Sequence, residues 1–170
     1  TALLLVNDEE WRTVPFAHTE RFRGYDACLC FEAGQLDDGS DAVIVRRKAA
    51  GTIRVEARGR PAHSGSAPHR GRSALLALAD AAQRVAACSD PAGPARLTAV
   101  PTILHSGEAF NVVPPAGELI CDLRADALDA FDPVLEAVPA ELDGVAIDTT
   151  LVRAWPSMDT RAAASAALAE

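Results

Sequence analysis

The sequence lacks an apolar run of 18 residues, and its N-terminus lacks the basic-then-apolar pattern of a signal peptide. The first absence excludes an α-helical membrane span, so no membrane partner is expected. The second leaves export without support, and a cytoplasmic location is expected. A C-x-x-C pair is absent as well, although the chain has four cysteines (Cys28, Cys30, Cys88 and Cys121). This spacing is typical of buried, reduced thiols rather than of a zinc or redox site.

The sequence also lacks an excess of positive charge. Its formal net charge is -8 at pH 7 and its pI is about 4.9. A polyanion such as DNA would be repelled by this charge, so nucleic acid is not expected as a partner.

Apolar residues make up 49% of the 170 residues, which is enough for one good core or two small ones. Near the N-terminus, three apolar stretches read as buried strands of a sheet covered on both faces. They are residues 2–6, 27–31 and 42–45. A polar segment between the first two predicts a helix and loop, so this part is expected to belong to an α/β layer.

From Gly51 onward the pattern changes to that of strands with one solvent-exposed face. Alternation of apolar and charged residues predicts four strands, at 51–59, 97–107, 117–125 and 144–153. Such strands favour an antiparallel sheet with exposed edges. An unpaired edge invites a second copy of the chain, which favours a dimerisation role.

Two helices are expected between these strands. Leu75, Leu78, Ala82 and Val85 recur at helical spacing and predict a helix that stops before Ser89. A second, short helix begins at Asp126 or at Asp132, and Pro139 limits its far end. The order β-α-β-β-α-β predicts an α+β, ferredoxin-like fold, with a four-stranded antiparallel sheet and two helices on one face.

Carboxylates follow two of the apolar stretches near the N-terminus. Asp8, Glu9 and Glu10 follow the first, and Glu32 follows the second. Acids at the ends of strands in one sheet are suited to a hard or borderline cation, because such ions take carboxylate oxygens. If Glu10 binds a metal, Glu9 is free to accept a proton from water that the metal activates. The alternative is a solvated loop or a helix N-terminus, where acids are also favourable.

Five sequence blocks, in order, resemble one family of enzymes. The blocks are "NDEE", "FEAG", "GRPAHSGSAPHRGRSA", "FNVVP" and "CDLR". The chain resembles the di-zinc exopeptidases and deacylases that include glutamate carboxypeptidase, aminoacylase, acetylornithine deacetylase and succinyl-diaminopimelate desuccinylase. The resemblance implies a lid, or dimerisation, domain inserted into a zinc-binding catalytic domain.

For the first two blocks, the resemblance implies three roles. Glu9 matches the general base, Glu10 matches a ligand of one zinc, and Glu32 matches a ligand of the other. Two zinc ions per site are implied, with cobalt or manganese as other candidates.

The later blocks lie in the lid. His63 of "AHSG" matches a histidine that reaches the active site of the partner and stabilises the oxyanion. Asn111 of "FNVVP" and Arg124 of "CDLR" match residues that hold the substrate's carbonyl oxygen and terminal carboxylate. Arginine suits this role because its planar fork can bind both carboxylate oxygens. A homodimer is therefore implied, and the other histidines, His18, His69 and His105, are given no role.

The resemblance predicts three segments. Residues 1–47 are expected to be part of the catalytic domain, 48–154 the lid, and 155–170 a return linker with the start of a helix. The family's upstream H-x-D pair, bridging aspartate and late histidine ligand have no counterpart here, and "WRTVPF" follows "DEE" where the family has small residues. The chain is thus expected to be an internal piece of a longer enzyme, inactive by itself.

The expected activity of the parent protein is metal-dependent hydrolysis of the amide bond of an N-acyl amino acid or small peptide. The alternative is a noncatalytic dimerisation module of a degenerate family member. The sequence on either side of the chain discriminates between the two, because only an enzyme needs the missing metal ligands.

Overall fold

The computed structural model describes residues 19–25, 35–42, 44 and 46–158. The chain divides into two units, one formed by Ile44–Asp159 and the other by the remainder. In the second unit the described elements are α1 (Thr19–Phe22) and a hairpin of β1 (Gln35–Asp37) and β2 (Ser40–Ala42). The hairpin turns at Asp38 and Gly39, which both have positive φ, as a two-residue Asp-Gly turn requires.

Two of the three strands expected near the N-terminus lie outside the described residues. Residues 2–6 and 27–31 lie outside the described residues. Of the stretch 42–45, Ala42 ends β2, whereas Ile44 is exposed and belongs to no strand. The prediction of a buried strand is therefore wrong at Ile44, because the β1–β2 hairpin ends before it. The assignment of 1–47 and 155–170 to a catalytic domain stays a prediction.

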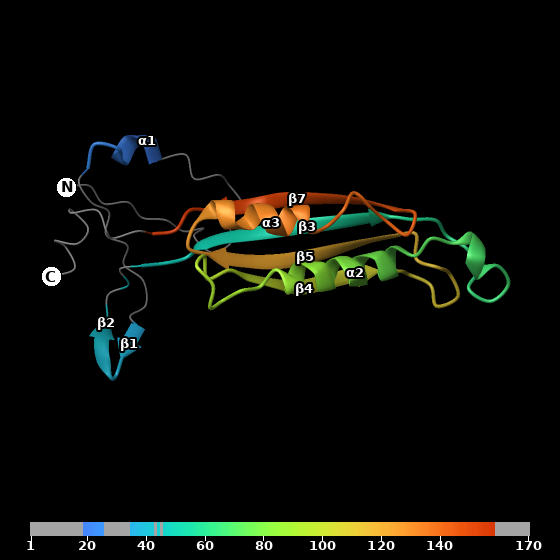
Figure 1. Cartoon of the computed structure of the whole chain (residues 1–170), viewed down its shortest axis with the longest axis horizontal. Helices are drawn as coiled ribbons and strands as arrows, with labels where there is room; N and C mark the ends of the chain where they lie inside the picture. Colours follow the sequence, from blue (N-terminus) through green and yellow to red (C-terminus); the bar gives the residue numbers. More distant parts are fainter. Residues whose placement is uncertain (1–18, 26–34, 43, 45, 159–170) are drawn as a thin grey trace. The chain divides into compact units, whose positions relative to one another are not determined.

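The unit Ile44–Asp159 is built on a five-stranded antiparallel sheet in the order β4-β5-β3-β7-β6. Its strands are β3 (Ala49–Arg58), β4 (Thr98–Ser106), β5 (Ala116–Ala125), β6 (Glu141–Leu142) and β7 (Val145–Trp155). The four predicted strands are confirmed as β3, β4, β5 and β7 (Figure 1). The two-residue β6 was not predicted. It pairs with the start of β7 through Asp143 and Gly144, a second Asp-Gly turn with positive φ at both residues.

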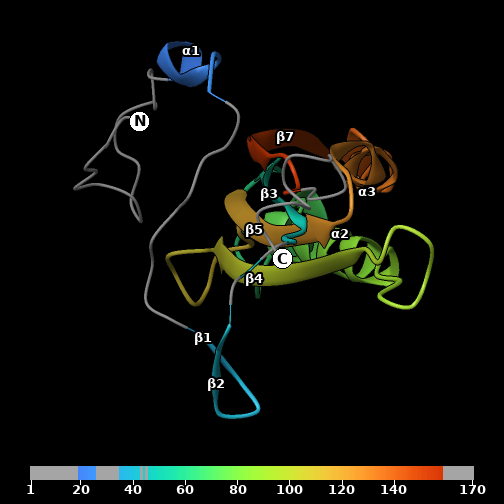
Figure 2. The ribbon, with the colours of Figure 1, turned by 90° about the vertical axis from the view of Figure 1, so that its left-hand side faces the viewer.

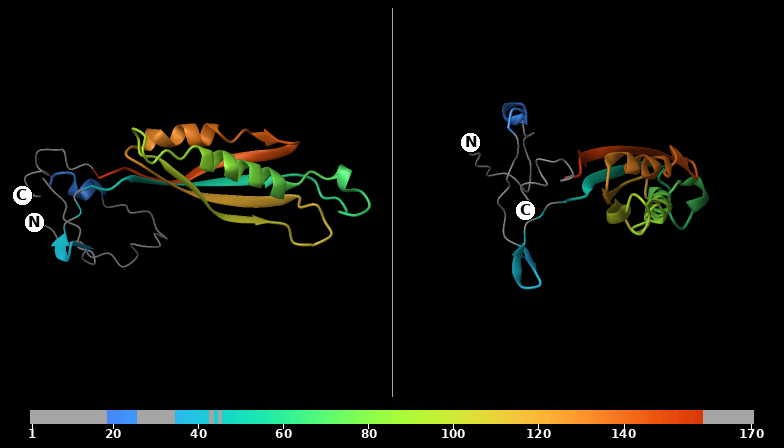
Figure 3. Two further views of the ribbon diagram at one scale, coloured as in Figure 1. Left: turned by 60° about the horizontal axis from the view of Figure 1, so that its bottom comes forward. Right: turned by 60° about the vertical axis from the view of Figure 1, so that its left-hand side comes forward.

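Both helices of this unit, α2 (Ala74–Ala87) and α3 (Asp132–Glu136), lie on the same face of the sheet (Figures 2 and 3). Two 3-10 turns, η1 (Pro68–Arg70) and η2 (Leu128–Phe131), complete the unit. The helix expected from Asp126 or Asp132 begins at Asp132, because Pro133 suits its first turn, and it ends before Pro139. The α+β prediction is confirmed. Within the described ranges, no helix is long and apolar enough to cross a membrane.

The core lies between the sheet and the helices. Ile53 and Val55 of β3 and Leu78 and Val85 of α2 are fully buried. Arg54 and Arg58, which alternate with the buried residues of β3, lie on the opposite face. We call this helix-free side of the sheet the open face.

The apolar face of α2 differs from the one expected. Leu78 and Val85 are buried as predicted, but Leu75 is 39% exposed and Leu76 is 71% exposed. Alanines fill most of the buried face instead (Ala74, Ala77 and Ala81). Small side chains let the helix lie close to the sheet, and Leu75 and Leu76 are left on its outer side.

The two described cysteines are unpaired. Cys121 is fully buried, and burial raises the pKa of its thiol to about 11. It therefore behaves as the small apolar residue expected from the sequence. Cys88 is only half-buried.

Candidate functional site

Three of the six predicted site residues lie in the described part of the chain. They are His63, Asn111 and Arg124, and all three belong to the unit Ile44–Asp159. The predicted base Glu9 and metal ligands Glu10 and Glu32 lie outside the described residues. Their roles stay predictions.

His63 is presented on an exposed loop beyond the end of β3 (Figure 1). Its ring atom Nδ1 accepts hydrogen bonds from the backbone N–H groups of Gly65 (3.0 Å) and Ser66 (3.2 Å). A nitrogen that accepts two N–H groups carries no proton, so the neutral ring has its proton on Nε2. The loop thus holds His63 as a hydrogen-bond donor directed away from its own backbone.

Asn111 lies beside His63, although the two are far apart in sequence. The backbone N–H of Ser64 donates to the Asn111 carbonyl at 2.9 Å, and that of Val113 donates to the Ala62 carbonyl at 2.9 Å. His63 and Val112 face each other across an isolated antiparallel bridge. The loop after β3 and the loop between β4 and β5 are therefore joined at their tips. The side-chain amide of Asn111 has no hydrogen-bond partner among the described residues.

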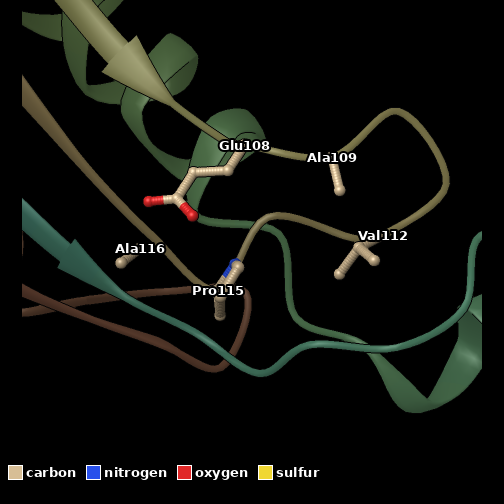
Figure 4. A pocket seen from close by; sticks show the side chains of 6 residues that line it. Glu108, Ala109, Val112, Pro115 and Ala116 are labelled. Atoms are coloured by element: carbon tan, nitrogen blue, oxygen red, sulfur yellow. The ribbon is translucent and has the colours of Figure 1, made fainter.

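A hollow of about 280 Å³ lies at the base of the β4–β5 loop. It is lined by Gly107, Glu108, Ala109, Val112, Pro115 and Ala116. Figure 4 shows the Glu108 side chain extending across it towards Pro115 and Ala116. Neither His63 nor Asn111 lines it, so this hollow does not gather the predicted site residues.

Arg124 lies on the open face of β5. Its neighbours across the sheet are Ala50 on β3 and Thr98 on β4. Its guanidinium binds the Asp122 carboxylate through two hydrogen bonds, from Nε to Oδ2 at 2.9 Å and from Nη2 to Oδ1 at 3.0 Å. Residues two apart on a strand share a face, which brings these two side chains together.

Arg124 is far from His63 and Asn111 within the chain. Arg124 pairs with Ala50 at the start of β3, whereas Ala116 pairs with Arg58 at its end. Arg124 is eight residue steps along β5 from Ala116, a distance of about 27 Å. His63 and Asn111 lie in loops beyond the Arg58 end. The structure therefore brings together His63 and Asn111 but not Arg124.

A charged cluster around Asp126 lies at the Arg124 end of the sheet. The Asp126 carboxylate accepts hydrogen bonds from Nε and Nη2 of Arg96 at 2.6 to 3.1 Å, and Nη2 of Arg46 is 3.6 Å away. Nζ of Lys48 donates to the Arg96 carbonyl. The hydrogen bonds from Arg96 lower the pKa of Asp126, and the nearby positive charges of Arg96, Arg46 and Lys48 act in the same direction, although partial burial opposes them.

The described residues contain no group of three or more His, Cys, Asp or Glu side chains that could hold a metal ion. The chemistry offered by this part of the chain is hydrogen-bond donation and carboxylate binding. A metal site would have to use other residues.

Sequence reasoning missed two features of these sites. It did not single out Asp122, although the spacing of "CDLR" places Asp122 and Arg124 on one face of a strand. It also missed Phe110, which is fully exposed beside Asn111. Nothing in the local pattern marks an apolar residue as exposed, because the periodicity of the strands ends at the loop.

The chain was compared with known protein families. Residues 45–150, more than half of the chain, match the peptidase dimerisation domain of the M20 group. This range covers His63, Asn111 and Arg124.

A curated relative from Haemophilus influenzae is a homolog of one of the subunits of p-aminobenzoyl-glutamate hydrolase. It is 32% identical over 96 residues, which are 56% of this chain and 22% of the relative. The chain therefore spans about a fifth of that protein.

Solved structures show the same fold. An aminobenzoyl-glutamate utilization protein from Klebsiella pneumoniae has a TM-score of 0.61 at 24% identity, covering 69% of this chain and 31% of that one. A tripeptidase from Staphylococcus aureus has a TM-score of 0.54 at 21% identity, covering 68% and 32%.

Proposed function

This chain belongs to the M20 peptidase dimerisation domain family, and we propose that it supplies the lid of a metal-dependent amidohydrolase that works as a homodimer. The proposed substrate is an N-acyl amino acid or small peptide, cleaved at its amide bond. The relative from Haemophilus influenzae, whose name describes hydrolysis of p-aminobenzoyl-glutamate, supports this substrate class.

The observation that carries the proposal is the separation of the two sets of polar groups. His63 and Asn111 lie more than about 27 Å along the sheet from Arg124. An N-acyl amino acid spans less than about 10 Å, so one substrate cannot touch both sets within one copy. Two copies resolve this, because Arg124 of one protomer and the partner's His63 and Asn111 can contact the same substrate.

The roles follow from the chemistry of each group. The Nε2–H of His63 is a fixed, neutral donor, suited to an oxygen on which negative charge develops. The free amide of Asn111 can donate to the same carbonyl oxygen, and Arg124 can bind the terminal carboxylate. These groups position the substrate and stabilise charge.

The described lid residues have no metal cluster, so the metal is assigned to the catalytic domain. Glu10 and Glu32 are the residues of this chain that would hold it through carboxylate oxygens, and Glu9 would accept the proton of the attacking water. Zinc is the proposed ion. When bound, it would make water a stronger acid and polarise the scissile carbonyl.

The loop that carries His63 is basic, which suits an approach to such a carboxylate-rich site. Residues 58–72 contain four arginines and no acid, in a chain of net charge -8. Arg58 is 3.5 Å from Glu56, while Arg60, Arg70 and Arg72 have no carboxylate partner among the described residues. A positive loop is attracted to the acidic stretch around Glu9 of the partner subunit.

Self-association is proposed through β4 and α2. β4 is an edge strand of nine residues without a charged side chain, and it exposes Val100, Ile103 and Leu104. Leu75 and Leu76 are exposed on α2, which packs beside β4. An uncharged edge next to apolar side chains suits a second copy, because two such strands can pair and bury the leucines.

Subunit complementation in the full-length protein tests the proposal. His63→Ala and Glu9→Ala should each abolish hydrolysis of p-aminobenzoyl-glutamate or N-acetylated amino acids. A 1:1 mixture that exchanges protomers should recover about a quarter of wild-type activity, because half the dimers are mixed and each has one intact site. His69→Ala, in the same loop, is the matched control and should keep full activity.

Two results would count against the proposal. If mixed dimers form but no activity returns, His63 does not act across the interface. If the wild-type protein binds no metal and hydrolyses nothing, the noncatalytic dimerisation module is the better description.

A further inference from the structure

We propose that Asp122 is a positioning residue that holds the Arg124 guanidinium ready for a carboxylate. The inference rests on the proposed function, which gives Arg124 its substrate. Asp122 makes two parallel hydrogen bonds to Arg124, at 2.9 Å from Nε and 3.0 Å from Nη2. This side-on arrangement fixes both the direction and the plane of the guanidinium.

Asp122 leaves the other edge of the guanidinium free. Arginine has five N–H donors, and Asp122 takes one on Nε and one on Nη2. Both hydrogens of Nη1 and the second hydrogen of Nη2 remain. A second carboxylate can bind this end-on edge with two hydrogen bonds, so Arg124 can hold Asp122 and a substrate carboxylate together.

Among the described residues, Asp122 is the one that can orient the Arg124 guanidinium. Arg124 lies between Ala50 and Thr98 on the neighbouring strands, and neither carries a charge. Another carboxylate of the open face, Glu118, is engaged by Arg54 at 2.9 Å. Arg124 has no other hydrogen-bond acceptor among the described residues. Without Asp122 its long side chain would sample many rotamers.

The ion pair between Asp122 and Arg124 is expected to contribute little to the stability of the fold. The side chains of Arg124 and Asp122 are 49% and 39% exposed. Ion pairs at such sites are screened by water, and their net contribution to folding is small. The effect of Asp122 is therefore expected in carboxylate binding, and Asp122→Asn should fold like the wild type.

The first test uses the chain itself. The Arg124 Nε–H resonance, followed by ¹⁵N NMR, should be distinct in the wild type because two hydrogen bonds hold the group. In Asp122→Asn it should move towards the averaged position of a free arginine. Asp148→Asn, an exposed aspartate of β7 with no ion pair among the described residues, is the control and should leave the resonance in place. An unchanged resonance in Asp122→Asn overturns the positioning role.

The second test uses the full-length protein and two substrates, an N-acetyl amino acid and its C-terminal carboxamide. Asp122→Asn should raise KM for the acid about fivefold to tenfold, the loss typical of one ordinary hydrogen bond, with kcat little changed. The carboxamide should be unaffected, because it makes no ion pair with Arg124. Asp122→Glu, which keeps the carboxylate, should restore part of the preference for the acid.

A lower KM for the acid would overturn the inference, since it would make Asp122 a competitor of the substrate. An unchanged preference for acid over carboxamide would overturn it too. If the wild-type protein hydrolyses neither compound, the proposed function fails, and the NMR result still decides whether Asp122 orients Arg124.

Discussion

Gly51 lies where β3 passes directly beneath the ring of Phe131. A Cβ at position 51 would be 2.7 Å from ring atom Cε2 of Phe131, which is fully buried and held by the core. The absent side chain therefore allows the loop with η2 to close over the sheet. The packing at this position therefore depends on the absence of a side chain, just as the core around it depends on large side chains.

Gly51→Ala is expected to lower the free energy of unfolding by about 1 to 3 kcal/mol, because the ring must move or the strand must shift. Urea unfolding followed by circular dichroism measures the change. Gly65→Ala is the control, since its Cβ would make an ordinary contact with His63 at 3.4 Å. Equal stability of the two variants would show that Phe131 moves aside freely.

At the scale of elements, the ion pairs of Asp126 connect two segments of the chain. One segment precedes β3, and the other is the turn before β4. Asp126 follows β5 directly, and it binds Arg96 before β4 and Arg46 before β3. Arg96 has a φ of 47°, a left-handed conformation that is unusual for arginine. The ion pair with Asp126 helps to hold the turn in this conformation.

The stability contributed by Asp126 should depend on pH. Hydrogen bonds from Arg96 hold its pKa below the ordinary value, so the ionised form is favoured in the folded state. Its contribution is full above the unfolded pKa of about 4 and is lost as pH falls through the lower folded value. Asp126→Asn should be less stable than the wild type at pH 7. This difference should shrink below about pH 4, as measured by urea unfolding across pH. A constant difference down to about pH 2 would contradict the ion-pair explanation.

At the scale of the whole molecule, the edge strand β4 and the helix α2 packed beside it both expose large apolar side chains. Leu76 is the most exposed of those on α2, the helix that packs beside the uncharged strand β4. Leu76→Glu should weaken self-association by about tenfold or more, because a charge would be buried between two copies. Sedimentation velocity over a range of concentrations measures this.

The matched control tests the other side of the sheet. Val152→Glu changes a residue of β7 that is 41% exposed, on the side of β3 away from β4. It should leave self-association unchanged. The reverse pattern, with Val152→Glu alone dissociating the protein, would move the interface to the β7 side.

Much of the fold could be predicted because its signals are local. Alternation along β3, helical spacing in α2 and Pro133 at the start of α3 each involve neighbouring residues. The Asp-Gly pairs at 38–39 and 143–144 carried an equally local turn signal, and reading them would have revealed β6 and the β1–β2 hairpin. The roles of Glu9, Glu10 and Glu32 rest on motifs alone and stay predictions.

By itself, the sequence determined the order of the four long strands and the two helices of the unit Ile44–Asp159, and it offered His63, Asn111 and Arg124 for chemistry. The tertiary structure alone decided which strand lies at the edge, which leucines face outward, and that Arg124 lies far from His63. These properties depend on pairing between distant residues, such as Ala50 with Trp155 and Arg58 with Ala116. The alternation of side chains along a strand specifies which of them share a face. It does not specify which other strand pairs with that strand in the sheet.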